Sequence, residues 1–183
     1  MTLYQQADAV ATTVLIAAVG PALLRYFLYH CRDREEAADF LQETWLRIHR
    51  VRHTYRPGES VLSWIYAIAR HVRVDGYRKK RRLESHEHAT DILPESACLP
   101  GLAHPGLTDF ATLVAELPSA QREIITMLKV SGMSLEEVAQ ATRSSVGSVK
   151  QKAHRAYEKL RALKGKSGSQ RGVQSGRDQR DDT

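Results

Sequence analysis

The stretch from Ser134 to Arg161 constrains the fold of this chain most, because apolar residues recur there with helical spacing on both sides of a polar break. Ser134 with Glu137 has the pattern of a capping box, which predicts the start of a short helix. A polar segment at 142–144 ends that helix, and a second apolar stripe follows at spacings of three and four. The stripe contains Val146, Val149, Ala153, Ala156, Leu160 and Leu163. The sequence therefore predicts two helices joined by a tight turn.

The other faces of this second helix are polar and mostly basic. They carry Ser148, Lys150, Gln151, Lys152, His154, Arg155 and Lys159. In a major groove, glutamine suits adenine and arginine or lysine suits guanine, so the pattern favours a helix-turn-helix that binds duplex DNA. The alternative is a helical hairpin with a solvated basic face.

The charge of the chain also favours an anionic partner. Its 183 residues have a formal net charge of +6 and a pI near 9.5, and 42% are hydrophobic, enough for real cores. The segment from Arg70 to Arg82 contains seven Lys or Arg and one acidic residue. The segment from Arg143 to Lys166 contains eight Lys or Arg and one acidic residue. Two separate basic zones suggest two contacts with a polyanion. The only cysteines, Cys31 and Cys98, indicate no disulfide framework, which is typical of a reduced cytoplasm.

The apolar run from Val10 to Leu24 needs its own explanation. No basic segment precedes it, Asp8 does, and Gly20-Pro21 interrupts it, so it lacks the pattern of a signal peptide. It is also short for a membrane span. We expect a buried helix and no membrane insertion.

Helical periodicity dominates the chain, and convincing strand patterns are absent. The expected fold is all-α, with two small helical domains. Breaks at Arg32-Asp33 and at Arg56-Pro57-Gly58 divide the first domain, residues 1–82, into a bundle. Residues 83–107 have the composition of a flexible linker, 108–164 form the second domain with Gly132 as a helix C-cap, and 165–183 are expected to be a disordered tail.

The predicted helix at 34–50 has an unusual outward stripe. Asp39, Gln42, Glu43, Leu46 and Arg50 share a sector away from its apolar face, and Phe40 is expected to point away from the core as well. Acids, an amide and a leucine together fit a protein-binding surface; an ordinary surface helix is the alternative.

The predicted helix at 60–82 alternates aromatic and cationic residues on one face. Tyr66, Arg70, Arg73 and Tyr77 recur at spacings of four, three and four. Rings can stack on unpaired bases while guanidinium groups hold the backbone, so the face suits single-stranded nucleic acid. Trp64, His71 and Arg78 form another edge, although Trp64 packed against the bundle is equally consistent. The basic run 78–82 would contact phosphates or form a solvated helix end.

Catalysis finds little support, because the chain has no Gly-rich phosphate loop, nucleophile elbow or zinc-protease motif. His86, His88 and Cys98 lack a fourth ligand at the usual spacing, so we expect no metal and no cofactor.

These motifs together resemble a known family. The segments 39–47, 55–60 and 63–70, with Asp75 and the basic run, resemble region 2 of the extracytoplasmic-function group of sigma-70 factors, and 117–122 with 148–161 resemble region 4. The resemblance implies a non-enzymatic, cytoplasmic factor that directs RNA polymerase to promoters. A helix-turn-helix regulator that binds duplex DNA without polymerase is the alternative hypothesis.

The resemblance also implies three binding surfaces. Core polymerase would be bound by Asp39, Phe40, Gln42, Glu43, Leu46 and Arg50. The minus-ten element would be bound by Tyr55, Arg56, Ser60, Trp64, Tyr66, Arg70, His71, Arg73, Tyr77, Arg78, Lys79 and Lys80. The minus-35 element would be bound by Ser145, Ser148, Lys150, Gln151, His154 and Arg155.

The implied partners are promoter DNA, the coiled coil of the largest polymerase subunit, the flap region of the second-largest subunit, and an anti-sigma factor. His71 departs from the family pattern, which often has Asn beside the Arg at this position. The minus-ten base preference of the family therefore cannot be transferred to this chain.

Overall fold

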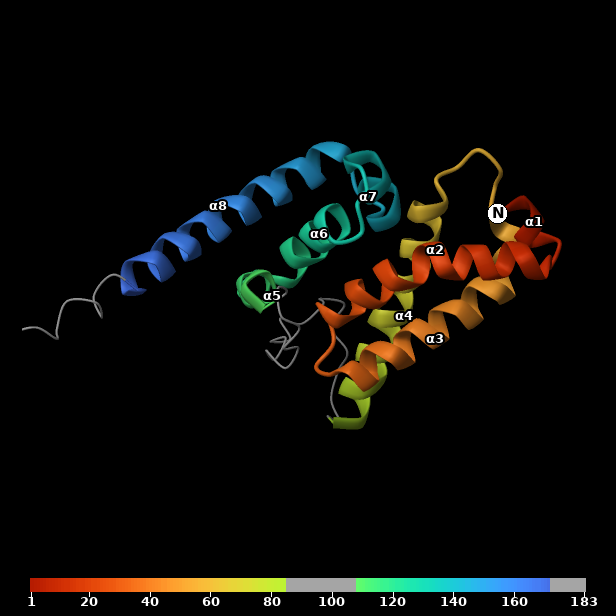
Figure 1. Cartoon of the computed structure of the whole chain (residues 1–183), viewed down its shortest axis with the longest axis horizontal. Helices are drawn as coiled ribbons and strands as arrows, with labels where there is room; N and C mark the ends of the chain where they lie inside the picture. Colours follow the sequence, from red (N-terminus) through yellow and green to blue (C-terminus); the bar gives the residue numbers. More distant parts are fainter. Residues whose placement is uncertain (85–107, 172–183) are drawn as a thin grey trace, which may run out of the picture.

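The computed structural model describes residues 1–84 and 108–171, and every secondary-structure element in these ranges is helical, as predicted (Figure 1). The first range contains α1 (Thr2–Gln5), α2 (Ala9–Leu28), α3 (Arg34–Val51), a 3-10 turn (Arg52–Thr54) and α4 (Val61–Glu84). The second contains α5 (Thr108–Ala115), α6 (Ser119–Lys129), α7 (Leu135–Thr142) and α8 (Val146–Arg171).

Side-chain caps set where several helices begin. The Asp8 carboxylate accepts a hydrogen bond from the backbone N–H of Ala11 at 2.7 Å, and Asp33 accepts one from Glu36 at 2.8 Å. Ser134 and Glu137 form the predicted capping box at the start of α7. Each cap satisfies an N–H group that the first helical turn leaves unpaired.

Helix α2 differs from its prediction in two ways. It continues through Pro21, and only its second half is buried, whereas Val10 and Val14 are 72% and 61% exposed. The first half carries apolar residues on more than one face, and Val10, Val14 and Ile16 remain exposed although α3 packs against α2. Within the described residues α2 is the one helix long and apolar enough to cross a membrane, a property that core helices of soluble proteins share.

Helices α2, α3 and α4 form a bundle in which α3 packs against both of its neighbours (Figure 1). The contact between α3 and α4 is close at Gly76, where an added Cβ would lie 2.6 Å from Cζ of Phe40. The Phe40 ring also packs on Phe27, with centroids 5.8 Å apart. Phe40 therefore belongs to the buried side of α3, and the expectation that it points away from the core is wrong.

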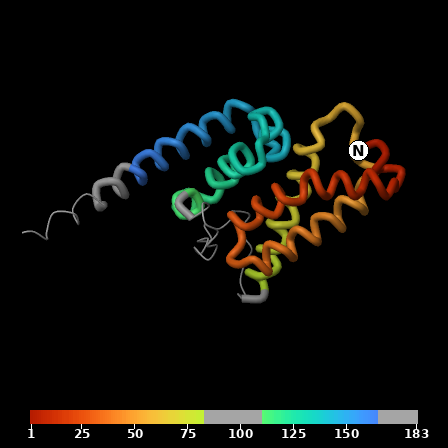
Figure 2. The backbone as a smooth tube through the Cα atoms, in the orientation of Figure 1, coloured from red at the N-terminus to blue at the C-terminus, as the bar shows by residue number. Residues whose placement is uncertain are grey.

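The two predicted domains lie against each other, with α6 and α7 beside the bundle and α8 on the outside (Figure 2). Helix α7 packs along α4, and one apolar cluster continues from Phe27 and Tyr66 in the bundle to Met127 and Val138 in the second unit. A shared core of this kind means that the two units bury surface on each other. The predicted linker falls almost entirely in 85–107, outside the described residues.

Turns in the second unit have the backbone geometry that the break residues suggest. Gly132 adopts a left-handed φ of +67°, although the C-cap of α6 is Val130, two residues earlier than predicted. Arg143 ends α7 with a φ of +51°, which starts the turn into α8. Helix α8 then continues to Arg171, seven residues into the segment predicted to be a disordered tail.

Candidate nucleic-acid interface

The outward face of α8 carries the side chains predicted to contact the minus-35 element. Val149, Ala153 and Ala156 are buried, so the opposite side of the helix faces solvent. Gln151 and Arg155 lie exposed on that side. Their amide and guanidinium groups are the donors and acceptors that read adenine and guanine in a major groove.

The remaining predicted residues of this set surround that face. Ser145 is exposed and caps α8, because its Oγ accepts a hydrogen bond from the N–H of the half-buried Ser148 at 3.2 Å. Lys150 and His154 are exposed, and His154 Nε2 lies 3.3 Å from the Glu158 carboxylate. The structure thus brings all six predicted residues to the first three turns of one helix.

Helices α6, α7 and α8 enclose a groove of about 490 Å³ beside this face. Tyr157 forms part of its apolar lining, with Lys129 Nζ 5.9 Å from the ring centroid. Lys129, Lys150 and His154 line it as well. Positive charge next to the exposed face of α8 suits the phosphate backbone of a bound duplex.

Helix α4 presents its predicted minus-ten residues on two different sides. His71, Arg78 and Lys79 are exposed, whereas Tyr66 is fully buried and Arg73 is 8% exposed. The expectation that Tyr66 belongs to an accessible stacking face is therefore wrong for this arrangement. The reasons are that the ring of Tyr26 in α2 meets Tyr66 edge-on, with centroids 5.3 Å apart, and that α7 of the second unit packs along α4.

A single carboxylate from the second unit binds both arginines of this buried side. Glu123 Oε2 accepts a hydrogen bond from Arg70 Nε at 3.2 Å, and its Oε1 accepts one from Arg73 Nη2 at 2.5 Å. Tyr26 Oη lies 3.4 Å from the same Oε1. The Glu123 side chain is only 5% exposed, so these partners replace most of the water around its charge.

The buried groups around Glu123 have shifted pKa values. Burial raises the pKa of the Tyr26 hydroxyl, so this tyrosine stays protonated. Burial alone would lower the pKa of Arg73, but the adjacent Tyr26 and Glu123 more than offset that effect and leave its pKa raised. Arg73 therefore remains cationic inside the interface.

His30 lies at the same boundary. Its Nε2 is 2.9 Å from Thr126 Oγ1, and its ring packs on Tyr26 with centroids 4.7 Å apart. Burial lowers the pKa of the imidazole well below its ordinary value, and the positive charges of Arg73 and Arg122 lower it further. His30 is consequently neutral at pH 7.

A second polar contact joins the start of α4 to the start of α7. Ser60 Oγ donates to Glu137 Oε1 at 2.7 Å, and Ser63 Oγ donates to the Glu137 carbonyl at 3.1 Å. Glu137 Oε2 meanwhile accepts from the Ser134 N–H at 2.8 Å, and Ser60 Oγ accepts from the Ser63 N–H at 3.2 Å. One carboxylate thus connects the caps of two helices in different units.

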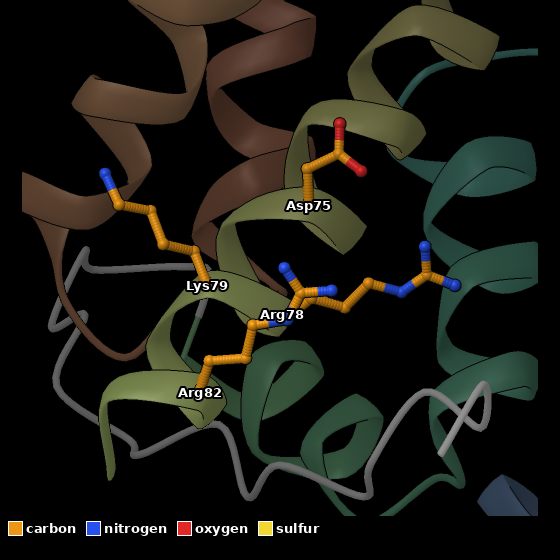
Figure 3. A pocket seen from close by; sticks show the side chains of 4 residues that line it. All are labelled: Asp75, Arg78, Lys79 and Arg82. Atoms are coloured by element: carbon orange, nitrogen blue, oxygen red, sulfur yellow. The ribbon is translucent and has the colours of Figure 1, made fainter. Parts of the chain in front are cut away.

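The last turns of α4 form a basic pocket of about 370 Å³ (Figure 3). Asp75, Arg78, Lys79 and Arg82 line it, and Arg78 and Lys79 point to opposite sides of the helix. Lys80, also predicted here, lies 3.6 Å from the Glu36 carboxylate. Three cations against one acid make this end of α4 suitable for phosphate groups.

The loop before α4 places the other predicted residues. Arg56 is exposed, while Tyr55 is buried with its hydroxyl donating to the Glu59 carbonyl at 2.6 Å. The Trp64 ring meets Tyr55 edge-on with centroids 5.7 Å apart and is half-buried, as is Tyr77. Tyr55 thus supports the loop and Trp64, and its ring is not available to a base.

The outward face of α3 retains five of its six predicted residues. Asp39, Gln42, Leu46 and Arg50 are exposed, and Leu46 has 46% of its surface accessible. Glu43 is half-buried and pairs with Arg47 at 3.4 Å; Arg47 also pairs with Asp75 of α4 at 2.8 Å. An exposed leucine among fixed charges is the composition expected of a protein-binding surface.

Sequence reasoning missed the residues that join the two units, above all Glu123. Its position next to Arg122 carries no local signal, because its partners are 50 and 53 residues away. Glu137 has a local signal, the capping box, but this predicts only its contact with Ser134. No cluster of three or more potential metal ligands occurs in the described ranges, and the weak candidate at His86, His88 and Cys98 lies outside them.

Comparison with known families identifies both units. Residues 15–83 match the family described as Sigma-70 region 2, and residues 107–160 match Sigma-70, region 4. The chain is 30% identical to the RNA polymerase sigma factor CarQ of Myxococcus xanthus over 152 residues, covering 82% of this chain and 87% of CarQ. It is 31% identical to the ECF RNA polymerase sigma factor EcfG of Rhodopseudomonas palustris, covering 81% of this chain and 82% of EcfG.

Solved structures have the same fold. The sigma factor RpoE of Bartonella quintana, solved with the anti-sigma factor NepR, matches with a TM-score of 0.68 at 23% identity, over 84% of this chain and 96% of RpoE. CnrH, solved with the cytosolic domain of CnrY, matches with a TM-score of 0.67 at 22% identity, over 88% and 92%. With both regions present in order and relatives aligned over most of their length, the chain belongs to the extracytoplasmic-function sigma factors of RNA polymerase.

Proposed function

We propose that this sigma factor directs core polymerase to promoters through three separate surfaces. The outward face of α8, with Gln151 and Arg155, binds the minus-35 element as duplex. The α4 helix and the loop before it bind the minus-ten element and hold its non-template strand. The outward face of α3, with Asp39, Glu43 and Leu46, binds the coiled coil of the largest polymerase subunit.

The observation that carries this proposal is the exposed face of α8. Among the described residues, Gln151 and Arg155 make no polar contact with other side chains, whereas the neighbouring His154 lies 3.3 Å from the Glu158 carboxylate. A helix that keeps an amide and a guanidinium accessible on its first turns is prepared for base edges rather than for internal packing. The Ser145 cap fixes where that helix begins.

The domain division follows from the same surfaces. Residues 1–82 form the region 2 module, 83–107 the linker, and 108–164 the region 4 module, with 165–183 as a tail that begins inside α8. The region 4 module would also bind the flap region of the second-largest subunit. By analogy with the sigma factors that it resembles, the protein would act in the cytoplasm and contribute to initiation without enzymatic activity of its own.

An anti-sigma factor is the expected regulator. Two proteins of the same fold, RpoE of Bartonella quintana and CnrH, were solved with an anti-sigma factor and with the cytosolic domain of CnrY, respectively. The exposed apolar residues of α2 and α3 leave surface for such a partner on the bundle. Co-purification from the native cell would identify it.

The test is initiation by the reconstituted holoenzyme. Core polymerase, the protein and pooled genomic promoter fragments should give transcripts from defined start sites, and an Arg155→Ala variant should give fewer from the same sites. Failure to bind core and to initiate at any fragment would refute the proposal. Tight, sequence-specific duplex binding in the absence of core would favour a polymerase-independent regulator instead.

A further inference from the structure

The contact between the two modules covers residues that the proposed function assigns to minus-ten DNA. Four of them, Ser60, Tyr66, Arg70 and Arg73, lie at the boundary with the second module. Two of the four are cations, and both are bound by one glutamate. The arrangement therefore occupies the groups with which α4 would hold a DNA strand.

Glu123 makes the contacts that a backbone phosphate would make. A planar carboxylate and a tetrahedral phosphate are both anions that accept directional hydrogen bonds from guanidinium groups. Glu123 uses its two oxygens separately, one for Arg70 at 3.2 Å and one for Arg73 at 2.5 Å. A phosphate approaching these arginines would have to displace it.

Glu137 reinforces the same closure at the start of α4. It holds Ser60 through its side chain and Ser63 through its carbonyl, at 2.7 and 3.1 Å. Both contacts join the two modules, and the bonded residues are more than 70 positions apart in the sequence. The closure thus rests on two acidic residues of the second module, one at each end of the covered surface.

We propose that the free protein is autoinhibited, with Glu123 acting as an internal substitute for a DNA phosphate on Arg70 and Arg73. This rests on the proposed function, since it requires α4 to be a DNA-binding face. Opening moves α6 and α7 off α4 and frees the two arginines together. Polyanions therefore favour the open form, because they bind the α4 surface that closure covers.

Only the open form binds DNA, so the apparent affinity for DNA falls as the population ratio of closed to open protein rises. If closure is favoured about tenfold, only about a tenth of the free protein is competent, and the apparent Kd for single-stranded DNA rises about tenfold. A variant that cannot close should recover this factor. This gain in affinity for single-stranded DNA distinguishes an ion pair that inhibits DNA binding from one that only stabilises the fold.

The experiment compares Glu123→Gln with Glu116→Gln in the full chain. Both substitutions remove one negative charge from the same module, but Glu116 is exposed, and the carboxylate that pairs with Arg70 and Arg73 is that of Glu123. Any gain from net charge alone is therefore common to both variants. Affinity for a short oligothymidine is measured by fluorescence anisotropy without core polymerase.

Closure itself is measured by energy transfer between dyes in the two modules. Ala17→Cys in α2 and Ala162→Cys in α8 are exposed labelling positions, in a Cys98→Ser background with Cys31 buried. Glu123→Gln should lower the transfer efficiency and bind oligothymidine up to about tenfold more tightly than Glu116→Gln. In the wild type, adding oligothymidine should lower the transfer efficiency in the same way.

Three results would overturn the proposal. The first is equal oligothymidine affinity for the two variants, and the second is an energy transfer in Glu123→Gln that stays at the wild-type value. The third is loss of the helical circular-dichroism signal in Glu123→Gln, because this would make Glu123 part of the folding core rather than a latch. The transfer measurement needs neither promoter nor polymerase, so its failure is distinct from failure of the proposed function.

Discussion

Gly76 is the position where the structure most sharply limits what the chain can contain. It lies in α4 against the ring of Phe40 from α3, and an alanine Cβ would stand 2.6 Å from Phe40 Cζ. Carbon atoms in contact are normally about 3.5–4.0 Å apart, so the ring or the helix would have to move by roughly 1 Å. The Phe40 ring also packs against Phe27, with centroids 5.8 Å apart, and this contact restricts its movement.

The expected cost of Gly76→Ala follows from two opposing effects. Overpacking costs about 1–3 kcal/mol, and the constrained ring places this site in the upper part, about 2–3 kcal/mol. Replacing a helical glycine by alanine returns about 1 kcal/mol of helix propensity. The net loss of unfolding free energy is therefore about 1–2 kcal/mol, which for a chain of this size lowers Tm by about 2–8 °C.

Gly147→Ala is the matched control. The same glycine-to-alanine change in α8 meets only Ser145 Oγ, at 4.0 Å, so it should raise the unfolding free energy by up to about 1 kcal/mol. Urea and thermal unfolding followed by circular dichroism measure both variants. In a Phe40→Leu background the cost of Gly76→Ala should shrink by about 1 kcal/mol or more. A shift of the same sign at both glycines, or an unchanged cost beside Leu, would refute the steric argument.

Three further predictions concern binding and pH. Because His30 has a depressed pKa in the closed protein, stability should be full above pH 6.5 and fall below it, by at most about 1.4 kcal/mol per pH unit; a His30→Gln variant with a parallel urea-midpoint profile would contradict this. Asp39→Ala with Glu43→Ala should weaken core binding and leave minus-35 binding intact, and unchanged core affinity by titration would argue against the α3 surface. Arg155→Ala should reduce minus-35 discrimination by about 1–3 kcal/mol in competition assays, whereas a uniform loss over all sequences would make Arg155 a phosphate contact.

Features determined by nearby residues were predictable from the sequence. The capping box at Ser134 and Glu137, the break before α8 and the exposed stripe of α8 all depend on contacts within a few positions, so periodicity and cap chemistry suffice. The outward stripe of α3 is a helical-wheel property and was predicted for the same reason. Phe40 was not, because it lies at the edge of that stripe and its burial depends on the absence of a side chain at Gly76, one helix away.

Features of the contact between modules were not predictable. Periodicity placed Tyr66 and Arg73 on an accessible face of α4, but Tyr66 packs edge-on against Tyr26 of α2, with ring centroids 5.3 Å apart, and Arg73 is buried beside Glu123. What covers the face is α6 and α7, whose contact with α4 is set by residues at least 50 positions away, such as Glu123. A single sequence carries no signal for that pairing, so an accessible aromatic surface and a covered one give the same pattern.

The chemistry of the covered face also bears on how easily it opens. Pairing buried charges recovers little more than the cost of removing them from water, so the Glu123 cluster adds specificity more than stability. The apolar cluster that both modules share favours closure without regard to ionic strength, whereas the charged contacts weaken as anions compete for Arg70 and Arg73. A larger fraction of the protein should therefore stay closed in simple salt than in a polyanion at the same concentration of negative charge. The reason is that only the polyanion makes the contacts with Arg70 and Arg73 that Glu123 loses on opening.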